Sequence, residues 1–256
     1  MAFAHEYNTE VAVNKKSKVR VGNKVSNLIS LLFGFSLLFF PISSCAIPIQ
    51  PADPPRILIL GDSISMGYLQ GVKAFFGESA VVMRPYILKT GKGENCEGTT
   101  RGVKAVHRWL ALEGGSWDII HFNFGLHDIK RINPNTKRNS DNPNHPPQAS
   151  LDLYIAQLRE ITQVLRKRGA KLIFATTTPV PAGKVRPHRD PADVLLYNQA
   201  AKDLMAEFQI QVNDLYAIAL PKLMEIQMPS NVHFTKEGSL ILARQVASAI
   251  RAEINP

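Results

Sequence analysis

The chain has 256 residues, of which 45% are hydrophobic and 20% are charged. This composition suits one globular domain and excludes a disordered chain. The formal net charge is +9, but the Lys and Arg residues are scattered and not interleaved with aromatic side chains, so we expect no nucleic-acid surface. No paired Cys or His stands at the spacing of metal ligands, and we predict no metal site.

Residues 1–45 have the order of an export signal, which is a basic stretch, an apolar run and then small residues. The apolar run, 28–42, is shorter than the ~20 residues that span a membrane. Its end, Ser43-Ser44-Cys45, resembles a bacterial lipoprotein signal, in which Cys45 becomes the lipidated first residue. Simple cleavage nearby and an uncleaved anchor are the alternatives. We expect an exported protein, either periplasmic or anchored to the membrane through that signal or lipid.

The rest of the chain alternates between strand and helix patterns. Residues 46–55 contain four prolines and predict a tether, followed by one domain over 56–256. Short apolar runs predict strands at 56–60, 80–83, 117–124, 171–176 and 210–212. Apolar residues at helical spacing predict helices over 68–76, 103–112, 151–167, 191–208, 217–225 and 236–252. Without hairpin signals, this alternation indicates an α/β fold with a parallel sheet of about five strands and helices on both faces.

Polar segments follow the first three predicted strands. Ser63 follows the first, the loop 95–100 follows the second, and Gly125 to Asp128 follow the third. The carboxyl ends of parallel strands meet at one edge of the sheet, where the active sites of such folds lie. A long loop, 130–148, is rich in Asn and Pro, and loops of this length are usually functional or mobile.

The segment Gly61-Asp62-Ser63 places a serine hydroxyl at a strand-to-helix junction, where its own N–H can help to hold an oxyanion. Taken alone, the same three residues are also a typical turn and helix N-cap. A serine needs a base to take its proton, and His233 stands on a loop before the last predicted helix. We therefore predict Ser63 and His233 as a nucleophile and its base. Cys96 is expected to be a small buried residue.

Three segments together resemble the SGNH (GDSL) hydrolase superfamily: 57–65 with Gly-Asp-Ser, 125–128 with Gly-Leu-His-Asp, and 232–238 with Val-His-Phe-Thr and Gly. The resemblance spans about residues 56–252, and the third-block variant looks like a subgroup. It implies a three-layer α/β/α flavodoxin-like domain that hydrolyses acyl esters without a metal or other cofactor. It also implies that Ser63 is the nucleophile and His233 the base. The nearest match to the family's oxyanion glycine is Gly98.

Two helper positions depart from the family pattern. The third block normally reads Gly-x-Asn-Asp, and His127 replaces the Asn that completes the oxyanion hole. A His N–H can also donate to an oxyanion, and Asn123 is a second candidate donor.

The position three residues before the histidine is normally Asp and here is Ser230, followed by Asn231. A backbone carbonyl could orient His233, which gives the Ser–His dyad that we favour. A carboxylate from elsewhere, such as Asp128, could substitute, and Ser230 and Asn231 are further candidates for orienting His233. The protein could also be slow or inactive.

The sequence thus predicts an exported serine esterase that removes an acyl group, preferably acetyl, from a small-molecule or carbohydrate ester. The alternatives are an acyltransferase on the same scaffold and a catalytically silent glycan-binding protein. Four basic side chains could meet a sugar, a carboxylate or a sulfate: Arg101, Arg186, His188 and Arg189. The sequence leaves the oligomeric state open.

Overall fold

The computed structural model describes residues 53–254. The predicted export signal, including Cys45, and nearly all of the predicted tether lie outside the described residues and stay predictions. Across residues 53–254, no helix is both long enough and apolar enough to cross a bilayer.

A parallel five-stranded sheet with the order β2-β1-β3-β4-β5 forms the centre of the domain. The strands are β1 Arg56–Leu60, β2 Val81–Met83, β3 Ile119–Phe122, β4 Lys171–Ala175 and β5 Gln211–Asn213. Ile57 to Leu60 in β1 are fully buried, as expected for a central strand that is covered on both faces. The sheet order is that of flavodoxin-like folds, and the strand order reverses between β1 and β3. The predicted fold class is confirmed.

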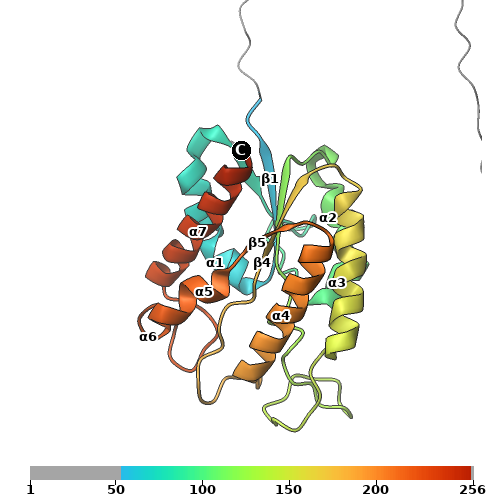
Figure 1. The fold of residues 1–256 in the computed structure, drawn as a ribbon, viewed down its shortest axis with the longest axis vertical. Helices are drawn as coiled ribbons and strands as arrows, with labels where there is room; N and C mark the ends of the chain where they lie inside the picture. Colours follow the sequence, from blue (N-terminus) through green and yellow to red (C-terminus); the bar gives the residue numbers. More distant parts are fainter. Residues whose placement is uncertain (1–52, 255–256) are drawn as a thin grey trace, which may run out of the picture. The chain divides into compact units, whose positions relative to one another are not determined.

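Helices cover both faces of the sheet. They are α1 Ser63–Phe76, α2 Thr99–Leu110, α3 Leu151–Arg166, α4 Pro191–Glu207, α5 Leu215–Ala219, α6 Leu223–Ile226 and α7 Lys236–Ile254. Helices α1, α5, α6 and α7 lie on one side, whereas α2, α3 and α4 lie on the other (Figure 1). This gives the three-layer arrangement that the sequence predicted.

Local capping explains why the observed boundaries differ from the predicted ones. Helix α1 begins at Ser63 rather than at residue 68, because the Asp62 carboxylate accepts a hydrogen bond from the Ile64 N–H at 2.8 Å. The helix predicted over 217–225 is wrong as one element. It divides into α5 and α6 around a 3₁₀ turn, Leu220–Lys222, because Pro221 lacks the N–H that would continue an α-helix.

Helices α1 and α7 pack closely at a glycine. A Cβ added to Gly71 would lie 2.6 Å from the Cβ of Ala243 in α7, far inside van der Waals contact. One turn earlier in the same helix, a Cβ on Gly67 would meet only the flexible hydroxyl of Ser239, at 3.3 Å. The two glycines therefore provide a matched test of this contact. The contact positions α7 and the loop that precedes it.

Gly71→Ala should lower the free energy of unfolding by about 1–3 kcal/mol, the usual cost of overpacking. Gly67→Ala should be neutral or stabilising by up to about 1 kcal/mol, because Ala is the better helix former. Urea unfolding of both variants measures the difference. Equal stabilities would contradict the close packing of α1 on α7.

Candidate active site

Ser63 stands in a tightly held turn at the carboxyl end of β1. The carbonyl of Asp62 accepts a hydrogen bond from the Ser65 hydroxyl at 2.6 Å, and the buried Arg84 guanidinium donates to Ser65 and to the Gly61 carbonyl. Burial raises the pKa of the Asp62 carboxyl, which caps the helix. Since Ser63 is the first residue of α1, its backbone N–H has no acceptor within the helix. A hydroxyl and a free amide are thus presented together.

The structure brings His233 to this hydroxyl across 170 residues of sequence. The ring Nε2 of His233 lies 2.8 Å from the Ser63 Oγ. The buried Gln227 side chain holds the loop that carries the ring, because it donates hydrogen bonds to the carbonyls of Pro179 and Val232. At its end the Thr235 hydroxyl accepts from the Gly238 N–H and caps α7.

A side-chain amide, rather than a backbone carbonyl, holds the other ring nitrogen. The Oδ1 of Asn231 lies 2.7 Å from the His233 Nδ1 and 3.1 Å from the His233 backbone nitrogen. A backbone N–H can only donate, so the amide atom that faces it is the oxygen. That oxygen also requires the proton of the ring to be on Nδ1, which leaves Nε2 free to accept from Ser63. The dyad with a carbonyl partner is therefore corrected to a Ser–His–Asn arrangement.

The other two candidates for the orienting role lie elsewhere. Ser230 is exposed and has a φ of 54°, and no hydrogen bond joins its side chain to His233 among the described residues. Asp128 is fully buried, and its Oδ1 accepts from both the N–H and the hydroxyl of Thr99, at 2.8 and 2.6 Å. A carboxylate that is used in this way is not the partner of His233.

Asp128 instead shapes the loop that carries Gly98. A Cβ on Gly98 would lie 2.8 Å from the Asp128 carboxylate, so the loop approaches the carboxylate as only glycine allows. Gly98 is the N-cap of α2, and across residues 53–254 its N–H donates no hydrogen bond to the protein. The amide is available to a ligand, and its role in the oxyanion hole stays a prediction from the resemblance.

His127, at the family's Asn position, is a neutral imidazole. Burial first, and then the nearby Lys130, lowers its pKa to about 3. Its Nδ1 lies 3.4 Å from the Lys130 Nζ. An ammonium can only donate, so Nδ1 is the acceptor and the ring proton is on Nε2. His127 therefore offers an N–H donor without a positive charge. Lys130 was not identified from the sequence, because a lysine inside a long loop gives no local signal.

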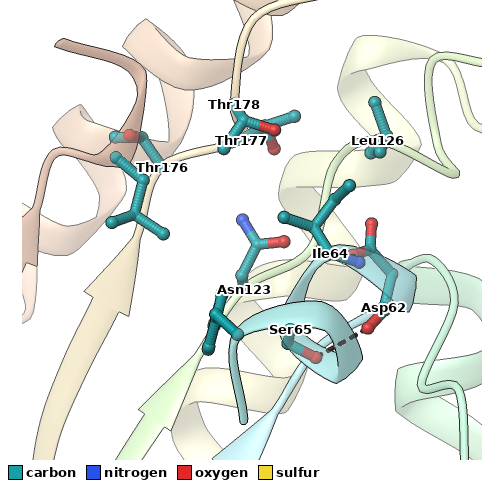
Figure 2. Close-up of a pocket in the computed structure, with 10 residues that line it drawn as sticks. Asp62, Ile64, Ser65, Asn123, Leu126, Thr176, Thr177 and Thr178 are labelled. Atoms are coloured by element: carbon teal, nitrogen blue, oxygen red, sulfur yellow. Dashed lines mark hydrogen bonds between the residues drawn. The ribbon is translucent and has the colours of Figure 1, made fainter. Parts of the chain in front are cut away.

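Asn123, the second candidate oxyanion donor, forms a hydrogen bond between two strands. Its Nδ2 donates to the Ala175 carbonyl at 2.7 Å, which ties the end of β3 to β4. The amide lies between Ile64 and the segment 176–178, where these residues line a small cavity (Figure 2). The cavity measures about 10 Å³, which is room for about one water molecule. Asn123 thus joins two strands through one N–H of its amide, and its role as an oxyanion donor stays a prediction.

The basic side chains singled out from the sequence have separate surroundings. Arg101 pairs with Glu94 at 2.6 Å, and Arg186 is exposed beside Asp141. His188 forms backbone hydrogen bonds to the long loop. Arg189 alone is buried, and its Nε donates to the Leu126 carbonyl at 2.7 Å. Cys96 is fully buried, and burial raises its thiol pKa to about 12.

The comparisons with known proteins agree with this geometry. A model described as the GDSL-like Lipase/Acylhydrolase family matches residues 59–241. A lipase/acylhydrolase from Enterococcus faecalis has a TM-score of 0.61 and 21% identity, over 77% of this chain and 96% of that one. The acetyl xylan esterase AlAXEase has a TM-score of 0.57 and 17% identity, over 76% and 99%. A variant of an acetyl-xylooligosaccharide esterase from Geobacillus has a TM-score of 0.54 and 17% identity, and the match covers 79% of this chain and 94% of that one. Among curated proteins, none matches the sequence.

The buried carboxyl of Asp128 predicts a measurable pH dependence. Burial raises its pKa to about 6 in the folded protein, against about 3.9 when unfolded. Between about pH 3.9 and about pH 6 the folded state binds the proton of this carboxyl more tightly than the unfolded state does. The free energy of unfolding therefore falls by about 2–3 kcal/mol as the pH rises through this range.

Asp128→Asn, which cannot ionise, should lose this part of the pH dependence in urea unfolding between pH 4 and pH 7. Asp62, whose pKa burial also raises, contributes to the pH dependence that remains, as do Glu94 and Asp214, whose pKa values are lowered. Asp203→Asn, at an exposed position, should retain the wild-type profile. An unchanged profile in Asp128→Asn would show that this carboxyl is not held in a desolvated site.

Proposed function

The chain belongs to the GDSL-like lipase/acylhydrolase family of carboxylic ester hydrolases, and we propose that it is a serine esterase that removes an acetyl group from a carbohydrate ester. One observation carries the proposal: the Ser63 Oγ and the His233 Nε2 are in hydrogen-bond contact at 2.8 Å. This is the relation between nucleophile and base that covalent acyl transfer requires.

The reaction starts at the Ser63 hydroxyl. The Oγ attacks the ester carbonyl while its proton passes to the His233 Nε2, and the tetrahedral oxyanion forms. The N–H groups of Ser63 and Gly98 and the Nε2–H of His127 are the donors for that oxyanion. His233 then returns the proton to the leaving alkoxide, which leaves an acyl-enzyme at Ser63. Water, deprotonated by His233, releases the carboxylic acid and restores the serine.

The imidazolium of His233 that forms in these steps has a neutral orienting group. Asn231 orients the ring but brings no charge, whereas in Ser–His–Asp triads a carboxylate does both. The Asp62 carboxyl beneath the nucleophile turn interacts electrostatically with His233, although burial raises its pKa and so disfavours its charged form. A Cys–His–Asn arrangement elsewhere shows that an amide is a workable orienting group.

The likeness to known folds supports a short acyl group on a carbohydrate. Two of the proteins with a similar fold act on acetylated xylan or xylooligosaccharides. This likeness is an analogy for the substrate. The small cavity next to the nucleophile turn is lined in part by Ile64 and Leu126, and Ser63 and His233 are not among the residues that line it.

Hydrolysis of 4-nitrophenyl acetate, butyrate and octanoate tests the proposal. The wild type should prefer acetate, and Ser63→Ala should lose at least about 10³-fold in kcat/KM, since the nucleophile is removed. Ser116→Ala, an exposed serine before β3, is the matched control and should retain full activity. A serine-directed organophosphonate should add its mass to the wild type and not to Ser63→Ala.

Other outcomes would select the alternatives. Equal rates for the wild type and Ser63→Ala would leave a silent binding protein. If acetylated sugar accumulates faster than free acetate when sugar acceptors are present, the protein is an acyltransferase. A preference for octanoate would contradict the short acyl group.

A further inference from the structure

Two buried cations border His127. Lys130 is 9% exposed and Arg189 is 6% exposed, although Lys and Arg side chains are seldom buried this deeply without a partner. Lys130 contacts the His127 ring at 3.4 Å, and Arg189 holds the carbonyl of Leu126, the preceding residue, at 2.7 Å. Both cations therefore lie close to His127, the residue that stands where the family has its oxyanion-hole Asn.

Neither cation has a carboxylate partner within the part of the chain that the structure describes. The ion pairs there, at 4.0 Å or less, include neither residue. Arg189 uses its Nε and one further N–H on the carbonyls of Leu126 and Pro187, so three of its five N–H donors have no protein acceptor. Lys130 has one such contact, to His127. Buried charges of this kind normally require a partner.

The carboxylates that interact electrostatically with the two cations form hydrogen bonds or ion pairs with other groups. Asp62 acts on Arg189 but caps α1 through the Ile64 N–H. Asp128 acts on Lys130 and is bonded to Thr99.

Glu97 also acts on Lys130 and pairs with Arg101 at 3.7 Å. None of these groups neutralises the pair by direct contact. Burial lowers the pKa of Arg189 to about 10, which leaves it charged at neutral pH.

We infer that Lys130 and Arg189 form an anion-binding subsite, and that the esterified sugar carries a carboxylate or a sulfate near the acetyl group. The inference rests on the proposed function and specifies its substrate class. Arg189 offers the planar pair of donors that suits carboxylate and sulfate oxygens, and Lys130 adds a point charge. The neutral state of His127 fits this arrangement, because a third cation would repel the two.

A purely structural role makes a different prediction. If Arg189 serves only to hold the Leu126 carbonyl, an uncharged donor such as glutamine can replace it with no effect on the choice of substrate. The decisive quantity is therefore a ratio of two substrates measured on one variant, which cancels any general loss of activity.

The test compares pairs of acetylated sugars that differ only in charge. One pair is an acetylated uronic acid and its methyl ester, and the other is an acetylated sulfated sugar and its unsulfated form. The wild type should prefer the anionic member by about tenfold or more in kcat/KM, and Arg189→Gln should reduce that ratio to about one. Arg189→Lys should retain part of the preference. The pair with the larger ratio identifies carboxylate or sulfate as the anion.

Arg168→Gln is the matched control, because it removes the same charge from an exposed position just before β4, at the opposite edge of the sheet. It should keep the wild-type ratio. If the wild type hydrolyses both members of each pair equally, the anion subsite is overturned and the esterase remains. If Arg189→Gln keeps the preference, the assignment to Arg189 is wrong.

A binding measurement separates failure of the subsite from failure of the esterase. Inorganic sulfate and glucuronate should raise the Tm of the wild type, and the rise should be lost in Arg189→Gln but not in Arg168→Gln. If no ester is hydrolysed and the rise is present, the proposed function fails and the subsite stands. The absence of any rise that depends on Arg189 would overturn the subsite whatever the hydrolysis shows.

Discussion

The hydrogen bond between the Asn231 Oδ1 and the His233 Nδ1, at 2.7 Å, decides whether the residues at the sheet edge can react. The same oxygen accepts from the His233 backbone N–H, and this second bond fixes which way the amide faces. With its proton held on Nδ1, the ring turns an acceptor toward Ser63. An amide achieves this orientation without a charge, so Asn231 does not stabilise the imidazolium as the carboxylate of a Ser–His–Asp triad does.

The partner of Nδ1 also sets the tautomer of His127, but there it places the proton on the other ring nitrogen. Lys130, which can only donate, faces the Nδ1 of His127 and leaves the proton on Nε2. Burial keeps that ring neutral, with a pKa of about 3, so it is suited to donate to an oxyanion and not to act as a base. Two histidines thus have different tasks because their Nδ1 partners differ, which is how environment divides chemical roles between like groups.

The sheet and the place of Ser63 could be predicted because their signals are local. Five short apolar runs define the strands, and parallel strands bring their carboxyl ends to one edge. The helpers could not be assigned in this way, because each depends on a contact between distant segments. Asn123 was predicted to face the oxyanion, but its amide bonds to Ala175 in β4. Asp128 was a candidate partner of His233, but it lies under Thr99 and Gly98. Asn231 was one of three candidates for orienting His233, and the family spacing gave no reason to favour it, because it stands two residues before the histidine rather than three.

The proposed reaction depends most on the tautomer of His233, and nuclear magnetic resonance measures that tautomer directly. Long-range proton–nitrogen spectra of the ¹⁵N-histidine-labelled protein at neutral pH should show the His233 ring with its proton on Nδ1. Asn231→Ala, which removes the acceptor, should shift the ring toward a mixture of tautomers, while Asn231→Asp should retain the Nδ1–H form. A wild-type ring that is protonated on Nε2, or a tautomer that is unchanged in Asn231→Ala, would contradict the orienting role of Asn231.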